Sequence, residues 1–176
     1  MASKVELKIN LSGPDEANRL MSDEFFARYM KDDFQVRDVI GACYDTAFEE
    51  LAAKDLRLRV RKINHMKVAD LKDGKTAPNG LFLGRQWLCK FMGAFSVLDK
   101  LYERGAPKIE LTAPLLPTTA FKYTRYSATL YMPDQVRAEL SFDVGDSDAV
   151  LGLELLFGMG SELMLFADEF RREFSK

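Results

Sequence analysis

Cysteine and histidine are scarce in this sequence, and their scarcity excludes several kinds of site. The 176 residues include two cysteines and one histidine. These three side chains lie far apart in the sequence and cannot supply the four ligands of a structural zinc site. Cys43 and Cys89 fall in apolar, helix-like patterns, which favours buried free thiols over a disulfide framework. No nucleophile is marked near His65, so we predict no catalytic residue, no metal site and no cofactor.

A long apolar run is also missing. The richest apolar stretch, residues 150–166, is interrupted by Glu154, Glu162 and three glycines. It is too short and too polar to span a bilayer, so we expect no membrane partner. The sequence begins Met1-Ala2-Ser3-Lys4 and shows no apolar core of a secretory signal there. Together with the free thiols, this predicts a cytoplasmic protein.

Alternation of apolar and polar residues is the clearest pattern that the sequence does contain. It predicts strands over residues 4–11, 56–64, 120–131 and 136–144, since successive strand side chains point to opposite faces. The second of these strands has Leu56, Leu58 and Val60 on one face. Ile109 and Leu111 are expected to open the C-terminal meander. Residues 150–157 fit either a strand or a buried helix, and the preceding turn signal at 145–148 favours a strand.

Apolar residues at helical spacing predict four helical regions. The first runs from Pro14 to about residue 31 with a possible new cap at Ser22, and the others cover residues 33–51, 81–104 and 161–174. Residues 66–80 lose all periodicity and are expected to form the longest loop.

The predicted fold is therefore α+β. It has a mainly antiparallel sheet with a C-terminal meander, two N-terminal helices, one long central helix and a C-terminal helix. With 47% hydrophobic and 30% charged residues, the chain is in the ordinary globular range, and residues 1–176 are expected to make a single domain.

Charge is distributed unevenly although the net charge is only −2. Residues 56–125 contain 14 basic and 5 acidic residues, whereas the segments on either side are acidic. The basic segment is centred on the strand predicted at 56–64 and the loop after it. We predict a partner-binding face there, made of Arg57, Arg59, Arg61, Lys62 and Lys67.

Three functional hypotheses compete with a merely solvated basic face. The favoured one is a non-enzymatic structural or assembly subunit, such as a viral or phage component, whose basic face binds acidic surfaces of another copy or of another protein. The second is a single-stranded nucleic-acid-binding protein, with Phe121, Tyr123, Tyr126 and Tyr131 as stacking residues. The third, by analogy of fold alone, is a carrier of an apolar ligand of the helix-grip type.

Overall fold

Strands dominate the computed structural model, which describes residues 2–91 and 96–174. The strands found there are hydrogen-bonded in the order β1-β5-β4-β3-β2-β6-β7-β8, a series that returns to β1 and closes an antiparallel barrel. Their bounds are Ala2–Asn10 (β1), Gln35–Asp45 (β2), Leu56–Ile63 (β3), Met66–Asp73 (β4), Leu81–Phe91 (β5), Leu116–Tyr131 (β6), Arg137–Val144 (β7) and Ala149–Phe157 (β8).

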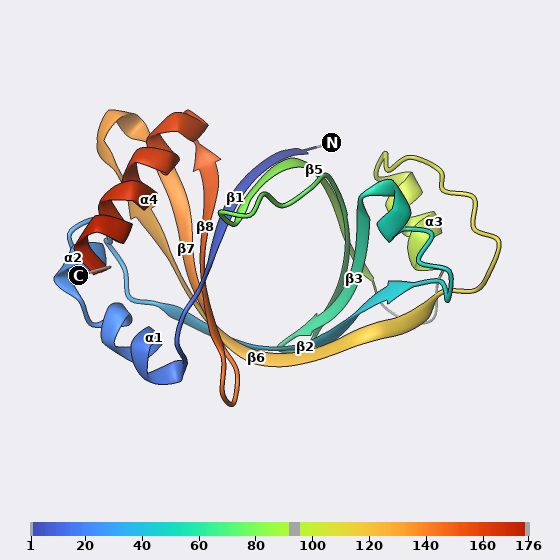
Figure 1. The fold of residues 1–176 in the computed structure, drawn as a ribbon, viewed down its shortest axis with the longest axis horizontal. Coiled ribbons are helices and arrows are strands. Elements are labelled where there is room, and N and C mark those ends of the chain that lie inside the picture. The colour runs from blue at the N-terminus through green and yellow to red at the C-terminus, as the bar shows by residue number, and fades with distance from the viewer. Residues whose placement is uncertain (1, 92–95, 175–176) are drawn as a thin grey trace. The chain divides into compact units, whose positions relative to one another are not determined.

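The helices are short by comparison (Figure 1). They are α1 (Pro14–Met21), α2 (Glu24–Ala27), α3 (Val97–Glu103) and α4 (Gly160–Phe174), with single 3₁₀ turns at Ala52–Lys54 and Pro133–Gln135. Within the described ranges no helix is long and apolar enough to cross a membrane.

The chain divides into two compact units. The first comprises Met1–Lys4 and Arg37–Tyr123, and the second comprises Val5–Val36 and Thr124–Lys176. Both units therefore contain part of β1 and part of β6. The assignment of residues 1–176 to a single domain stays a prediction.

The first unit has its hydrophobic core on one face of the sheet formed by β3, β4 and β5. α3 packs against this face, and Leu101 of α3 is fully buried there (Figure 1). The buried core residues are Leu51, Leu58, Ala69, Leu71, Trp87, Cys89, Leu101 and Ala106. The opposite face of the same strands consequently lies away from this core.

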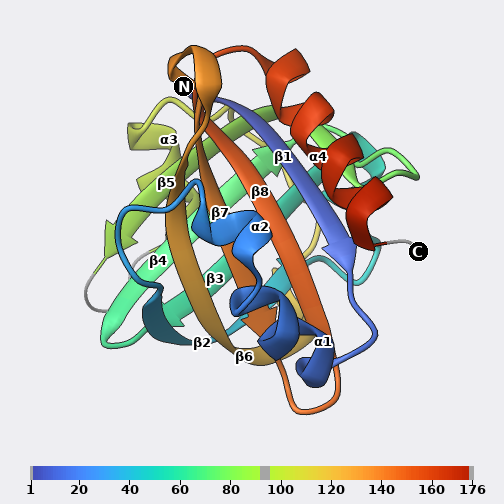
Figure 2. The same cartoon turned by 90° about the vertical axis from the view of Figure 1, so that its left-hand side faces the viewer.

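In the second unit, helices cover one face of β7 and β8. α1 and α4 pack on these strands, and Figure 2 shows α1, α2 and α4 together with β7 and β8. Phe26 of α2 is the centre of an aromatic cluster, with ring centroids 5.9 Å from Phe142 and 5.5 Å from Phe170. Such aromatic pairs stabilise the core beyond their buried area.

The predicted helix-rich α+β fold is wrong, because the strands close into a barrel and no long central helix is present in the described residues. Residues 33–51 contain β2 rather than a helix. Val36 and Ile40 lie on one face of β2 and Val39 and Cys43 on the other. Apolar residues on both faces of a strand produce spacings of three and four residues, which the sequence analysis attributed to a helix.

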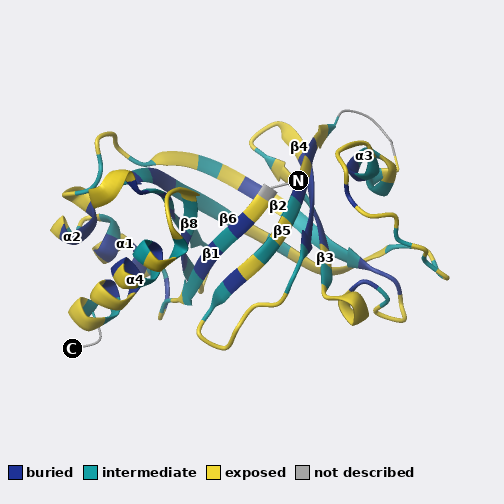
Figure 3. Ribbon diagram, turned by 90° about the horizontal axis from the view of Figure 1, so that it is seen from above, coloured by how far each residue is buried: buried dark blue, intermediate teal, exposed yellow. Residues whose placement is uncertain are grey.

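The same error affects residues 66–104. Residues 66–73 form β4 instead of a loop, and residues 81–91 form β5 instead of the first half of a helix. Only Val97–Glu103 is helical, and residues 92–95 lie outside the described ranges. Buried and exposed residues are interspersed along β5, with Phe82, Trp87 and Cys89 buried (Figure 3). Ile109 and Leu111 belong to no strand.

The predicted strands are confirmed where one face of the strand is apolar and the other is polar. Strands are present at residues 2–10, 56–63, 116–131 and 137–144, and residues 149–157 form the favoured strand. The helices that begin at Pro14 and end at Phe174 are also present, the first of them shortened by a new cap at Asp23.

Gly41 of β2 allows a close approach of β3. A Cβ atom at this position would overlap the carbonyl oxygen of Val60 and would lie 2.9 Å from the Cα of Arg61. We expect Gly41→Ala to lower the free energy of unfolding by about 1–3 kcal/mol, because backbone atoms of β3 would have to move. Urea denaturation measures this change.

Gly160→Ala is the matched control, since its Cβ would make only an ordinary 3.7 Å contact with Val5. In this helical position alanine is expected to be neutral or stabilising by up to about 1 kcal/mol. Equal stability of the two variants would contradict the close approach at Gly41.

Candidate functional site: a cationic cavity

Charged side chains gather on the face of the β3-β4-β5 sheet that lies away from the α3 core. Strand alternation places Arg59 and Arg61 of β3 on this face. In the antiparallel register Arg59 lies opposite Asp70 of β4, and Arg61 lies opposite Val68, which in turn lies opposite Lys90 of β5. The first unit is therefore amphipathic in an unusual way, with an apolar core on one face and basic residues on the other.

Asp70 organises the arginines of this face. Its Oδ1 accepts a hydrogen bond from Nε of Arg59 at 3.0 Å, and its Oδ2 accepts one from the second terminal nitrogen of the same guanidinium at 3.1 Å. A terminal nitrogen of Arg61 lies 3.4 Å from Oδ1. Gln86 donates to Oδ2 at 3.0 Å, and its own Oε1 accepts from Nζ of Lys4 at 2.9 Å. One carboxylate thus orients two guanidinium groups.

Asp70 stays ionised in this environment. Burial by itself would raise the pKa of Asp70, but the charge and hydrogen bonds of Arg59, together with the charge of Arg61, lower it below the usual value for aspartate. Asp70 is only 1% exposed. It cannot serve as a proton donor near neutral pH, and its role is to position the arginines.

Buried cations outnumber buried carboxylates in the described part of the first unit. The buried cations are Lys4, Arg59, Arg61 and Lys72, and the buried carboxylates are Asp45 and Asp70. Asp45 accepts hydrogen bonds from the backbone N–H groups of Thr46, Leu51 and Ala52 and so stabilises the turn before β3. The basic face consequently carries an excess of positive charge.

A cavity of about 1110 Å³ opens at the end of this face that lies near the β3–β4 turn. We call it the cationic cavity and define it by its basic lining residues, Arg37, Arg61, His65, Lys67 and Lys90. None of the described residues that line it is an aspartate or a glutamate. The basic side chains gathered around this cavity produce a positive potential that attracts anions. A ligand with several negative charges fits this lining.

The predicted partner-binding residues separate into two groups. Arg59 and Arg61 are buried on the basic face, whereas Arg57, Lys62 and Lys67 are exposed. Lys62 and Lys67 lie opposite each other in the register. The structure does not bring the five residues together as one surface, and their partner-binding role stays a prediction.

The sequence analysis missed Lys4, Asp70, Gln86 and Lys90, and it placed Lys72 on a basic loop instead of a strand. A signal for two of them was present, because Asp70 and Lys72 alternate with Ala69 and Leu71 as strand residues do. Val68 lies on the same face as Asp70, so apolar residues occur on both faces of β4 and the apolar-polar alternation of a strand is lost. Without β4 the pairing of Arg59 with Asp70 could not be derived.

The second unit has a polar face of its own. Arg125 of β6 makes two hydrogen bonds with Asp143 of β7, of 2.7 and 2.8 Å. Nζ of Lys8 lies 3.3 Å from Oε1 of Glu6. Glu154 lies opposite both Glu6 and Glu139 in the register of β1, β8 and β7. Among the described residues no group of three or more histidine, cysteine, aspartate or glutamate side chains is placed to hold a metal ion.

Solved structures of other proteins share this fold. One is a candidate adenylyl cyclase from Hippeastrum with a dominant triphosphatase activity, which matches with a TM-score of 0.61 and 18% identity over 97% of this chain and 87% of its own. Another is a candidate adenylate cyclase from Bacillus halodurans, with a TM-score of 0.56 and 17% identity over 99% of this chain and 92% of its own. The sequence matches no protein-family model and no curated protein. At these identities the likeness shows the fold alone.

These findings contradict the prediction of a non-enzymatic structural, assembly or viral subunit. The structures that share the fold are described as enzymes. Arg59 and Arg61 are also buried and form ion pairs with Asp70 of their own chain, so they do not present the exposed basic surface that the prediction assumed. The helix-grip carrier is likewise wrong, because the second of its two expected N-terminal helices is strand β2 and the strands close into a barrel. Association with another copy, another protein or nucleic acid stays a prediction.

Proposed function

We propose that this protein is a phosphohydrolase that binds a triphosphate chain, free or as part of a nucleotide, in the cationic cavity. The observation that carries the proposal is the lining of that cavity, where every charged or ionisable side chain is basic. The triphosphatase activity of the Hippeastrum protein, which shares the fold, supports the choice of triphosphate over other anions.

The residues of the cavity have separate roles in this proposal. Arg61 and Lys90 contact phosphate oxygens and neutralise the charge that develops as a phosphoanhydride bond breaks. A planar guanidinium can donate two parallel hydrogen bonds to one phosphate group, whereas an ammonium acts as a point charge. Asp70 is a positioning residue, because it holds Arg61 in place from behind. Fixed cations of this kind need no reorganisation during the reaction.

The proposed reaction is the attack of water on the terminal phosphorus atom. The bridging P–O bond breaks, orthophosphate leaves, and the bridging oxygen stays on the diphosphate product. The cavity supplies electrostatic stabilisation, which typically contributes more to phosphoryl transfer than any covalent step on the protein does.

The test is the release of orthophosphate from tripolyphosphate, ATP and diphosphate by the purified protein. Each substrate is assayed with and without MgCl₂, because Mg²⁺ commonly binds together with substrate phosphates. We expect turnover of tripolyphosphate, ATP or both, and weaker action on diphosphate, which carries fewer negative charges. Binding should weaken as NaCl increases from 50 to 500 mM, as expected for an electrostatic site.

The separate arms also identify the source of the triphosphate. Hydrolysis of tripolyphosphate alone indicates a free linear polyphosphate, and hydrolysis of ATP at a similar rate indicates a nucleotide. The proposal would be contradicted if ATP gave cyclic AMP without release of orthophosphate. It would also be contradicted if neither tripolyphosphate nor ATP bound to the protein.

A further inference from the structure

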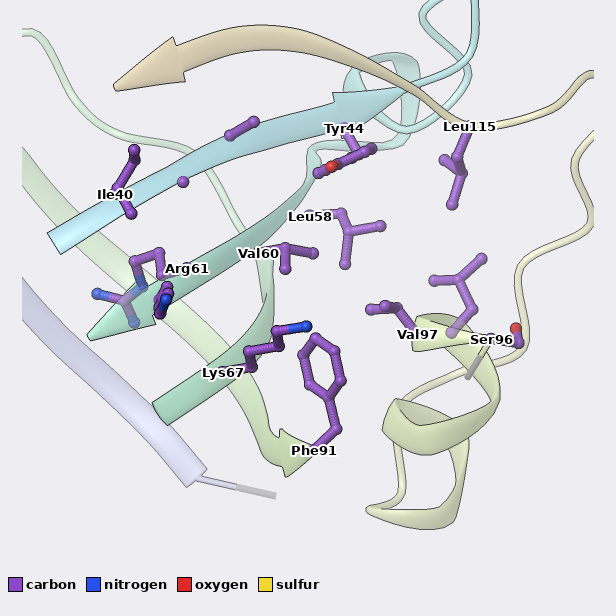
Figure 4. Close-up of a pocket in the computed structure, with 14 residues that line it drawn as sticks. Ile40, Tyr44, Leu58, Val60, Arg61, Lys67, Phe91, Ser96, Val97 and Leu115 are labelled. Carbon is purple, nitrogen blue, oxygen red and sulfur yellow. The ribbon is translucent and has the colours of Figure 1, made fainter. Parts of the chain in front are cut away.

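A second cavity, of about 630 Å³, lies on the opposite face of the first unit's sheet (Figure 4). We call it the α3 pocket. Ala42 of β2 and Val60 of β3 belong to its floor, and Val97 and Leu98 at the start of α3 line it from the side. This volume is within the range of about 300–1,000 Å³ that is usual for small-molecule sites.

The α3 pocket is lined mainly by aliphatic side chains. Leu58 on its floor is only 1% exposed, but Ile40 at one end is 53% exposed, although it is a large apolar residue. Tyr44 and Ser96 are the hydroxyl groups among its lining residues. Such a lining favours an extended apolar group over a sugar or a nucleobase, both of which need more hydrogen-bonding partners.

Two lysines are placed at one end of the pocket. The register makes a cross-strand row of Ile40, Lys62, Lys67 and Phe91 over β2, β3, β4 and β5. Like charges directly opposite each other destabilise a sheet. Within residues 2–91 and 96–174 no carboxylate forms an ion pair with either lysine. An anionic group between them would remove the repulsion.

We infer that the α3 pocket binds a single-chain amphiphile with an anionic head group, such as a long-chain carboxylate. The head group lies between Lys62 and Lys67, and the chain extends along Val60 and Val97. Aliphatic walls and a pair of cations at one end match the two parts of such a molecule. This ligand site is additional to the proposed hydrolysis and is no carrier function.

The two sites lie on opposite faces of one strand. Leu58, Val60 and Lys62 of β3 face the α3 pocket, whereas Arg59 is held by Asp70 on the basic face. Arg61, Lys67 and Phe91 line both cavities. Lys62 lines only the α3 pocket, so it is the residue with which the two sites can be tested separately.

The first experiment is isothermal titration of the protein with dodecanoate below its critical micelle concentration. Dodecanol, dodecyltrimethylammonium and acetate are the matched compounds, which lack the anion, reverse its charge or lack the chain. We expect one dodecanoate to bind per chain, dodecanol to bind at least tenfold more weakly, and the other two not to bind.

Variants then assign the site. Lys62→Glu and Val97→Asp are each expected to weaken dodecanoate binding at least tenfold. Lys75→Glu, a lysine that is 78% exposed on the β4–β5 turn, is the control and should leave binding unchanged. Hydrolysis of tripolyphosphate by Lys62→Glu should equal that of the wild type, so failure of this inference is distinguishable from failure of the proposed function.

Several results would overturn the inference. They are the absence of dodecanoate binding to the wild type and an equal effect of Lys62→Glu and Lys75→Glu. Sedimentation with phosphatidylglycerol vesicles without binding of free dodecanoate would also overturn it, since that result indicates a membrane surface as the partner.

Discussion

Replacing Asp70 by asparagine is expected to lower the free energy of unfolding by about 3–5 kcal/mol at pH 7. The variant keeps the shape of the side chain but removes the negative charge that accepts two hydrogen bonds from Arg59 and lies 3.4 Å from a terminal nitrogen of Arg61. Two guanidinium groups, each 6% exposed, would then be buried beside a neutral amide. Urea denaturation of wild type and variant at pH 7 measures the difference.

The same pair of proteins should differ in the pH dependence of stability. Because the folded protein lowers the pKa of Asp70 below its ordinary value of 3.8, the ionised carboxylate contributes its full stabilisation above about pH 4. That contribution is lost as the pH falls through the folded pKa. The wild type should therefore lose stability in acid more steeply than Asp70→Asn, and the two curves should converge.

Asp168→Asn is the control for this experiment. Asp168 forms an exposed ion pair with Arg171 on α4, with a distance of 3.5 Å. Exposed pairs of this kind typically contribute less than 1 kcal/mol, so a small change without acid convergence is expected. An effect of Asp70→Asn no larger than that of Asp168→Asn would contradict the role of Asp70 as an organising charge.

Arg61→Gln and Lys90→Gln are each expected to reduce kcat/KM for the triphosphate substrate by about 100-fold. Each variant removes one positive charge from the cationic cavity. Steady-state release of orthophosphate measures the effect. Lys75→Gln removes an exposed charge of the first unit that lines neither cavity and should have wild-type kinetics.

Arg61→Lys separates charge from folding. Arg61 is buried, so a loss of activity in Arg61→Gln could reflect a general loss of stability. The lysine variant keeps the charge but cannot donate two parallel hydrogen bonds to one phosphate. We expect it to recover part of the activity and to melt near the glutamine variant. Wild-type kinetics in both Arg61→Gln and Lys90→Gln would show that the cavity does not bind the substrate.

The strands that the sequence revealed are those with one apolar and one polar face. β7 alternates cleanly, and the structure buries Ala138, Leu140 and Phe142 on one side of it. β4 and β5 do not alternate in this way. Leu88 lies on the same face as Asp70, and Trp87 lies on the other. Only the partner strands decide which face of such a strand is buried, and single-sequence periodicity contains no information about them.

The candidate site was identified in part. The excess of basic residues between 56 and 125 and the common face of Arg59 and Arg61 were read correctly. The sequence could not show that this face is buried, because its charges are compensated by Asp70 across a strand pair and by hydrogen bonds from remote residues such as Gln86. Counting charges along the chain therefore suggested that Arg59 and Arg61 lie on an exposed surface, whereas the fold buries them.

One face of β3 is apolar and the other is basic, so the register of β3 with β2 and β4 matters more than its composition. Inserting one residue at Arg57 would shift every later position of the strand by one place and exchange the sides. Arg59 would then lie opposite Ala69 on the apolar face, and Leu58 would take its place opposite Asp70. Deletions or insertions of two residues keep each side chain on its original face of the strand. The strand should tolerate them better than deletions or insertions of one residue.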